Sequence, residues 1–318
     1  MTPQPVLIVA GPTASGKSGL AVELAEHFGG VVINADAMQV YRELAILTAR
    51  PGPEALARAE HRLYGTLPAT TACSAGLWLR LALAEISQAH EAGKLPILAG
   101  GTGLYLSALT DGLAALPEVP PRIRAEAREL HARLGSAGFH AALAARDPLT
   151  AARLGTGDRQ RLLRAWEVFA ATGRPLALWQ AEATQGPPPE LRFAVILLAP
   201  PRAALYAACE RRFDHMIAAG ALDEVQALMG LALDPALPVM KTIGVPELGR
   251  YLAGELSLAA AVAAAKQATR RLAKRQMTWF RHRPPAGQRF IAQDSESFKA
   301  AIFNFIRHFL LTAPASSV

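Results

Sequence analysis

The chain has 318 residues, a length that suits one large domain with an insertion or two domains. Its 33 Lys and Arg exceed its 26 Asp and Glu, and the formal net charge of +7 favours a polyanionic partner, with nucleic acid as the leading candidate. Two distant cysteines, Cys73 and Cys209, are too few for a disulfide framework or a metal cluster, so we expect a reducing compartment.

The apolar segments of the chain are too short to cross a membrane. The Ala-rich segment 256–265 lies between Glu255 and Lys266 and falls short of the roughly 20 apolar residues that a span needs. No basic segment precedes the first apolar run, so we expect no signal peptide. These features predict a soluble, cytoplasmic protein that does not contact a membrane.

The first apolar run, residues 5–10, leads into a glycine-rich loop and then into a periodic apolar segment. The loop reads Gly11-Pro12-Thr13-Ala14-Ser15-Gly16-Lys17-Ser18. A buried strand, this G-x-x-x-x-G-K-S pattern and a following helix predict a site for two or more linked phosphates. Loop amides and the helix N-terminus would hold the anion, Lys17 would reach the outer phosphate, and the Ser18 hydroxyl could ligate Mg²⁺. The loop alone does not say whether phosphate is transferred, hydrolysed or released.

Three further apolar runs, residues 31–33, 95–99 and 193–198, predict strands. Helical periodicity between successive runs indicates an α/β fold, with a P-loop-like parallel sheet flanked by helices. After the fourth strand we expect helices to about residue 281, a break at the prolines that follow, and a short helix over 295–311.

The pattern changes between the third and fourth predicted strands. A group of prolines ends one unit there, and the next segment is rich in Ala, Leu and Arg with helical periodicity. We therefore divide the chain into the first part of the α/β core at 1–116, a helical insertion at 117–186, and the completion of the core with basic C-terminal helices at 187–318.

Two polar segments follow predicted strands and should lie at the same edge of the sheet as the phosphate loop. The segment 34–41 places Asp36 directly after the second strand, where an N-cap, an Mg²⁺ ligand and a general base are all open roles. The segment 100–105 follows the third strand, and Thr102 offers a free hydroxyl there. Its glycines permit a close approach of backbone to ligand, although a tight turn would also explain them.

A basic run extends from Lys266 to Arg289 with no acidic residue before Asp294. On a helix, Arg270, Lys274 and Arg281 would share one stripe. Solvated faces normally mix the two signs of charge, so this one-sided run favours contact with the phosphates of a nucleic acid. The arginines of the predicted insertion alternate with acids and indicate such contact more weakly.

These segments resemble, in their order, the signature blocks of the tRNA dimethylallyltransferase (tRNA isopentenyltransferase) family. The matching blocks are residues 11–18, 36–41, 100–105, 159–168, 212–216 and 273–281. The chain departs from the family pattern where Val245-Pro246 follow Ile243-Gly244 in place of an aromatic and a basic residue. Ala37 also stands where Ser is common, and Trp166 where Leu is usual. The first departure concerns tRNA contacts near Lys241.

The resemblance implies transfer of the dimethylallyl group from dimethylallyl diphosphate to N6 of adenosine 37, beside the anticodon of tRNA, with release of diphosphate. It implies Mg²⁺ with Ser18 as its protein ligand. In this interpretation Lys17, Ser18 and Arg212 neutralise the leaving group, and Asp36 is the general base. The target base would be splayed out of its stack.

The same resemblance supplies the binding residues that we expect. The diphosphate would be bound by Gly11, Pro12, Thr13, Ala14, Ser15, Gly16, Lys17 and Ser18. The anticodon stem-loop of tRNA would be contacted by Asp36, Ala37, Met38, Gln39, Thr102, Arg124, Gln160, Arg161, Leu162, Leu163, Arg164, Lys241, Arg270, Lys274 and Arg275. Among these, Gln39, Thr102 and Arg124 would hold the flipped adenosine and its neighbours. We expect a monomer.

Two other classes of function fit the residues without the resemblance. A small-molecule or nucleotide kinase would use the same loop and strand order, although the basic helix and the acid-free glycine turn at 101–103 argue against it. A non-enzymatic, nucleotide-gated RNA-binding protein would keep the basic surfaces without needing Asp36.

Overall fold

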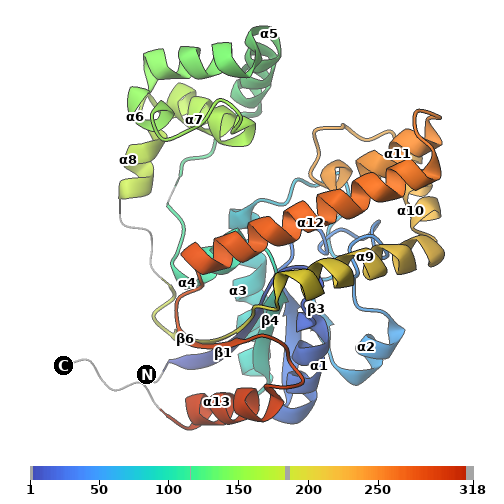
Figure 1. The fold of residues 1–318 in the computed structure, drawn as a ribbon. Coiled ribbons are helices and arrows are strands. Elements are labelled where there is room, and N and C mark those ends of the chain that lie inside the picture. The colour runs from blue at the N-terminus through green and yellow to red at the C-terminus, as the bar shows by residue number, and fades with distance from the viewer. Residues whose placement is uncertain (1–2, 115, 183–186, 313–318) are drawn as a thin grey trace. The chain divides into compact units, whose positions relative to one another are not determined.

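The structure, a computed structural model, describes residues 3–114, 116–182 and 187–312. The chain forms two compact units: Met1–Thr110 together with Pro187–Val318, and Asp111–Gly186. The first unit contains the sheet, whereas the described residues of the second form helices and their connections (Figure 1). The end of the insertion that the sequence predicts, Gly186, lies outside the described residues.

A six-stranded sheet forms the centre of the first unit, with strand order β3-β2-β4-β1-β5-β6 and parallel pairing throughout. Its strands are β1 Gln4–Ala10, β2 Gly30–Asn34, β3 His61–Arg62, β4 Leu95–Gly100, β5 Leu191–Leu198 and β6 Gln288–Ala292. The four predicted strands and the parallel α/β sheet are confirmed. Their apolar runs are continuous because helices cover both faces of the sheet.

The two edge strands, β3 and β6, were not predicted from the sequence. β3 has only two residues, and β6 exposes most of its side chains, so neither contains a buried apolar run. The predicted helix over 295–311 was wrong at its start, because residues 295–298 form a turn. The helix α13 begins at Lys299 and ends at Leu311.

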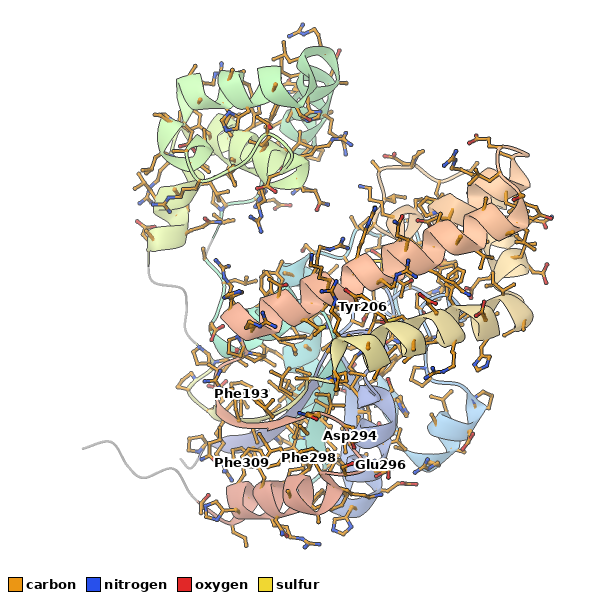
Figure 2. The ribbon with its side chains drawn as sticks, in the orientation of Figure 1. Phe193, Tyr206, Asp294, Glu296, Phe298 and Phe309 are labelled. Carbon is orange, nitrogen blue, oxygen red and sulfur yellow. The ribbon has the colours of Figure 1, made fainter. Side chains whose placement is uncertain are left out.

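Helices pack on both faces of the sheet (Figure 1). The other helices of the first unit are α1 Lys17–Phe28, α2 Pro53–Arg58, α3 Ala75–Glu91, α4 Gly103–Thr110, α9 Arg202–Ala218, α10 Ala221–Gly230, α11 Val245–Leu252 and α12 Leu258–His282, with a 3-10 turn at Val239–Lys241. Leu24 of α1 and Phe309 of α13 pack with Leu7 and Val9 on one face. Figure 2 shows Phe309 and Phe298 in this layer. The other face packs against a cluster that includes Trp78 of α3.

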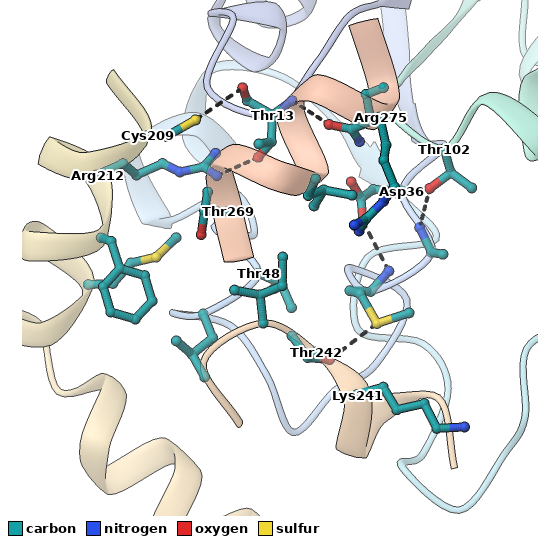
Figure 3. Close-up of a pocket in the computed structure, with 18 residues that line it drawn as sticks. Thr13, Asp36, Thr48, Thr102, Cys209, Arg212, Lys241, Thr242, Thr269 and Arg275 are labelled. Atoms are coloured by element: carbon teal, nitrogen blue, oxygen red, sulfur yellow. Dashed lines mark hydrogen bonds between the residues drawn. The ribbon is translucent and has the colours of Figure 1, made fainter. Parts of the chain in front are cut away.

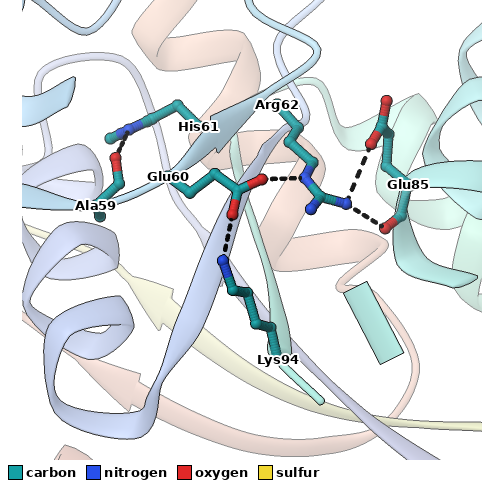
Figure 4. A network of polar contacts seen from close by, with 6 residues as sticks. All are labelled: Ala59, Glu60, His61, Arg62, Glu85 and Lys94. Atoms are coloured by element: carbon teal, nitrogen blue, oxygen red, sulfur yellow. Dashed lines mark hydrogen bonds and ion pairs between the residues drawn. The ribbon is translucent and has the colours of Figure 1, made fainter. Parts of the chain in front are cut away.

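Ion pairs hold the short edge strand β3 in place (Figure 4). Glu60 accepts hydrogen bonds from Arg62 Nε at 2.7 Å and from Lys94 Nζ at 2.6 Å. Arg62 also reaches the carboxylate of Glu85 at 3.4 Å. An exposed ion pair contributes only about 0–1 kcal/mol to the free energy of unfolding. The network therefore orients the strand and adds little to the stability of the fold.

The second unit consists of α5 Pro121–Arg146, which is kinked at Gly135, with α6 Pro148–Ala151, α7 Arg159–Thr172 and α8 Leu176–Ala181. Phe139, Leu162 and Val168 are buried in its own apolar core. The buried Asp147 carboxylate accepts the backbone N–H groups of Thr150 at 2.9 Å and of Leu176 at 3.3 Å, and so joins the N-termini of two helices. No helix among the described residues has the length and apolar character of a membrane span.

Candidate functional site

The predicted phosphate loop connects β1 to α1. Lys17 Nζ donates to the Pro12 carbonyl at 3.2 Å, which folds the side chain back over the loop. Burial lowers the pKa of Lys17 to about 8, while the negative charge of Asp36 opposes this shift and the positive charge of Arg212 adds to it. The Ser15 hydroxyl is buried and has no hydrogen-bond partner among the residues that the structure describes.

Thr13, inside this loop, is held by residues from two distant helices (Figure 3). Its backbone N–H donates to Gln276 Oε1 of α12 at 2.8 Å. Its hydroxyl oxygen accepts a hydrogen bond from the Arg212 guanidinium of α9. The Cys209 thiol lies 3.9 Å from the Thr13 carbonyl oxygen, in a long, weak contact. Arg212 is therefore directly beside the phosphate loop, although it is about 200 residues away in the sequence.

Asp36 lies at the carboxyl end of β2, as its sequence position predicts. The buried Asn34 side chain accepts the Asp36 N–H at 2.8 Å and donates to the Leu63 carbonyl at 3.1 Å, so it fixes the backbone at this strand end. One Asp36 oxygen, Oδ1, accepts the Met38 N–H at 3.0 Å. The other carboxylate oxygen, Oδ2, has no hydrogen-bond partner in the described part of the chain. Among the described residues, one acceptor atom of Asp36 is thus without a hydrogen-bond donor.

Thr102, after β4, is joined to the Asp36 loop. Its hydroxyl oxygen accepts the Ala37 N–H at 2.9 Å (Figure 3). The hydroxyl hydrogen stays available to a ligand, because the hydroxyl acts only as acceptor in this bond.

A cavity of about 280 Å³ opens between these groups. Its polar walls are Thr13, Asp36, Thr48, Thr102, Arg212, Lys241, Thr242, Thr269, Arg275 and Gln276. Its other walls are Ala37, Met38, Leu47, Cys209, Phe213, Met216, Ile243 and Leu272. The cavity therefore joins cationic groups beside the phosphate loop, a carboxylate at the end of β2 and an apolar surface.

Two side chains position the wall formed by Leu47 and Thr48. The Glu224 carboxylate of α10 accepts three successive backbone N–H groups, at 2.5, 2.8 and 2.9 Å, from residues 45–47. Gln39 Nε2 donates to the carbonyls of Thr48 and Ala49, both at 2.9 Å. The N–H groups of the Gln39 amide are thus hydrogen-bonded to the backbone of this wall. Gln39 is not among the residues that line the cavity.

The basic face of α12 is less one-sided than the sequence suggests, because α9 supplies acids. Arg270 forms an ion pair with Glu210, and Lys266 pairs with Asp214 at 2.6 Å. The lack of acidic residues within the run therefore does not show that Arg270 is unpaired, because its partner Glu210 comes from another helix. Lys274 is exposed and, among the described residues, has no carboxylate within salt-bridge distance. Arg275 lines the cavity.

Lys241 also borders the cavity, near the departure at Val245-Pro246. Its amine donates to the Ala236 carbonyl at 2.7 Å, and Figure 3 shows it directed away from the other labelled side chains. Val245 begins α11, and Glu247 accepts the Gly244 N–H at 2.8 Å.

The remaining predicted tRNA residues belong to the second unit. Arg124 on α5 and Gln160 and Arg161 on α7 are exposed, and Arg164 is half-buried beside Glu167. Leu162 is fully buried in the core of this unit, so its side chain is not at the surface where the predicted tRNA contact would need it. Leu163 is partly buried against the same core.

Several residues of the cavity were not predicted as site residues. Phe213 and Met216 share the segment 212–216 with Arg212, so that segment could have indicated them. Leu47, which lines the cavity, and Glu224, whose carboxylate holds the backbone of that wall, belong to no motif. Their places depend on the packing of α10 against the loop after β2, which no local pattern shows.

A parallel sheet with a G-x-x-x-x-G-K-S loop between β1 and α1, and a cavity at the carboxyl ends of its strands, defines a P-loop class protein. The family model for IPP transferase matches residues 39–283. The chain therefore belongs to the IPP transferase family.

Relatives and solved structures agree with this membership. A tRNA dimethylallyltransferase from Paramagnetospirillum magneticum is 56% identical over 98% of this chain and 99% of its own length. A tRNA dimethylallyltransferase from Rhodospirillum centenum is 56% identical over 90% of this chain and 91% of its own length. A tRNA isopentenylpyrophosphate transferase structure from Bacillus halodurans is 30% identical and has a TM-score of 0.66. The match covers 96% of this chain and 95% of that one. The structure of a eukaryotic dimethylallyltransferase acting on tRNA shares the fold with a TM-score of 0.78. It is 24% identical, and the match covers 99% of this chain and 81% of that one.

Proposed function

We propose that this chain transfers the dimethylallyl group of dimethylallyl diphosphate to N6 of adenosine 37 in tRNA and releases diphosphate. The observation that carries the proposal is the cavity, in which Asp36 and Thr102 share the walls with Thr13 and Arg212. A carboxylate that can accept a proton and a cationic group that can bind an anion thus line the same cavity. Alkyl transfer from an allylic diphosphate requires both. The family supports the substrate class, since relatives at 56% identity are named tRNA dimethylallyltransferases.

The leaving group would be neutralised by the phosphate loop and its neighbours. As the bond from C1 of the allyl group to the diphosphate oxygen breaks, negative charge grows on the diphosphate. Lys17, Arg212 and the loop amides would stabilise this charge. A phosphate oxygen would also give the buried Ser15 hydroxyl the partner that it lacks among the described residues. The loop would therefore serve C–O cleavage without phosphoryl transfer.

The residues at the loop fit a magnesium ion that is held mainly by the diphosphate. Ser18 is exposed in the first turn of α1. Within the described ranges, no group of three or more His, Cys, Asp or Glu side chains could hold a metal by itself. Mg²⁺ commonly takes one or two protein oxygens beside substrate phosphates and water. When bound, it would supply Lewis-acid stabilisation of the leaving group.

Asp36 would act on the nucleophile. N6 of adenine is a poor nucleophile because its lone pair is delocalised into the ring. Asp36 Oδ2 would accept the N6 proton as the bond between N6 and C1 forms, while Oδ1 stays bonded to the Met38 N–H. The Thr102 hydroxyl hydrogen would contact the flipped base. Lys274 and the exposed cations of α7 would meet backbone phosphates of the anticodon stem-loop. We expect the protein to act as a monomer in the cytoplasm, where tRNA is located.

Labelled donors test the proposal against the kinase alternative. Purified protein is incubated with Mg²⁺, an unmodified tRNA transcript, and either dimethylallyl diphosphate labelled in its allyl group or ATP labelled in its γ-phosphate. The proposal predicts that only the allyl label reaches the RNA. Label from ATP in the RNA, or no transfer from either donor, would contradict it.

A further inference from the structure

Gln276 is buried in the basic helix α12, with 9% of its surface exposed. Both ends of its side-chain amide are used. Oε1 accepts the Thr13 N–H at 2.8 Å, and Nε2 donates to the Gly101 carbonyl at 2.9 Å. One side chain thus joins the phosphate loop after β1 to the glycine-rich loop after β4.

The glycine-rich loop has no room for side chains where it meets α12. A Cβ at residue 101 would lie 2.5 Å from Gln276 Nε2 and 3.0 Å from the Gly11 carbonyl oxygen. Three residues further along the helix, the Trp279 ring occupies the space that a Cβ of Gly103 would need. The Gly101-Thr102-Gly103 pattern is therefore explained by close packing on α12.

The phosphate loop depends on contacts from outside itself. Ala14 has φ of 62°, a left-handed conformation that is unfavourable for a residue with a Cβ. Such a conformation persists only where surrounding contacts hold it. The residue before it, Thr13, has its N–H fixed by Gln276 and its hydroxyl fixed by Arg212.

We propose that Gln276 is a positioning residue that, through Thr13, holds the phosphate loop in the conformation that receives the diphosphate. The inference rests on the proposed function, because it takes the loop to be the diphosphate site. Without Gln276, the Thr13 N–H and the Gly101 carbonyl would lose their partners in a buried place, and the strained turn at Ala14 would relax.

Two variants separate hydrogen bonding from volume. Gln276→Met keeps the volume and removes both bonds. Gln276→Glu can restore both bonds when its carboxyl group is neutral, since that group then has one donor and one acceptor. When ionised, it turns an oxygen toward the Gly101 carbonyl and repels it. The exposed Gln267 on the same helix provides matched controls, Gln267→Met and Gln267→Glu.

The readout is the affinity for inorganic diphosphate with Mg²⁺, as a ratio to the wild type at each pH. Three charged side chains share the cavity wall with Gln276: Asp36 after β2, Arg212 of α9 and Arg275 of α12. Lys17 of α1 interacts electrostatically with Asp36 and Arg212. Comparison with the wild type and with Gln267→Glu at the same pH accounts for the titration that these groups show in the unmutated site. We expect Gln276→Met to bind diphosphate roughly 10-fold more weakly at every pH. We expect the deficit of Gln276→Glu to shrink as the pH falls from about 8 to about 5.

Two results would overturn the inference: unchanged affinity in Gln276→Met, or a pH-independent ratio for Gln276→Glu. Amide hydrogen exchange in the wild type provides a test that needs no variant, because the Thr13 N–H should be protected in the ligand-free protein. Free exchange at Thr13 would also reject the inference. If the wild type binds no diphosphate and alkylates no tRNA, the proposed function itself fails, and the two failures are distinguishable.

Discussion

The two oxygens of Asp36 suggest how its role can be tested. Oδ1 accepts the Met38 N–H, a bond that an amide oxygen can also accept. Asp36→Asn should therefore keep the local turn and lose only the ability to take a proton. We expect turnover to fall by roughly 10²–10⁴, the usual contribution of a positioned base. Single-turnover rates with dimethylallyl diphosphate and tRNA would measure this loss.

The affinity of the same variant for Mg²⁺ and diphosphate is the control. A base acts only on the nucleophile, so this affinity should change little. A large loss of Mg²⁺-dependent diphosphate binding would instead make Asp36 a metal ligand, which is one of the roles that its sequence position leaves open.

The lowered pKa of Lys17 predicts how donor binding depends on pH. Burial sets this pKa to about 8 in the free protein, so Lys17 is mostly charged below pH 8 and mostly neutral above it. A bound diphosphate favours the charged form and raises the pKa. Binding should therefore take up a proton above pH 8, and affinity should fall there by up to tenfold per pH unit.

Calorimetry with a non-cleavable thio analogue of dimethylallyl diphosphate, in buffers of different ionisation enthalpy, would detect this proton uptake. Lys17→Arg is the control, because its guanidinium stays charged throughout the range and should show no uptake above pH 8. Wild-type binding without proton uptake at pH 8.5–9 (about one unit above the pKa) would contradict a Lys17 that contacts the diphosphate with a lowered pKa.

At the scale of elements, α12 carries cations with different surroundings. Lys274→Gln removes an exposed cation and should weaken tRNA binding. The slope of the log binding constant against the log salt concentration should become shallower by about 0.7–0.9 for each phosphate contact that is lost. Arg270→Gln should have a smaller effect, because Glu210 already pairs with Arg270. Titrations of tRNA at two salt concentrations measure both slopes.

A charge-matched control for these variants is Lys299→Gln on α13, which packs on the other face of the sheet. It should leave the slope nearly unchanged. Equal slopes for the wild type and Lys274→Gln would remove this residue from the tRNA surface.

The contact between α4 and α12 predicts a loss of stability. A methyl group at residue 103 would overlap the Trp279 ring, so Gly103→Ala should destabilise the fold by about 1–3 kcal/mol. Gly19→Ala in α1 is the control, because nothing lies within 4 Å of its added Cβ and alanine favours helices. Denaturant unfolding of the two variants would show the difference, and equal stability would contradict the packing described.

The same elements show what local patterns reveal. β1, β2, β4 and β5 were predictable, because strands covered on both faces are continuous apolar runs. The edge strands β3 and β6 lack such runs. The meeting of the phosphate loop, Asp36 and Thr102 was also predictable, because parallel strands bring their carboxyl ends to one edge. The bond between Thr13 and Gln276 spans 263 residues and depends on tertiary packing that no motif encodes.

At the scale of the whole molecule, charge and family agree on the class of partner. The net charge of +7 indicated a polyanion, and the relatives carry names of enzymes for tRNA. Chain-wide charge could not identify which cations are free. Arg161 lies 3.8 Å from Asp158, the N-cap of α7, and Arg164 lies 3.6 Å from Glu167 on α7, so composition overstates the availability of these arginines for phosphates.

In the proposed function the cavity directs alkylation to one nitrogen of one nucleotide. The most direct measurement is mass spectrometry of an unmodified tRNA transcript after incubation with the protein, Mg²⁺ and dimethylallyl diphosphate, followed by digestion to nucleosides and to sequenced fragments. We expect N6-dimethylallyladenosine at position 37 and no product on a transcript with guanosine there. Alkylation at another atom or position, or an RNA without any added allyl group, would contradict it.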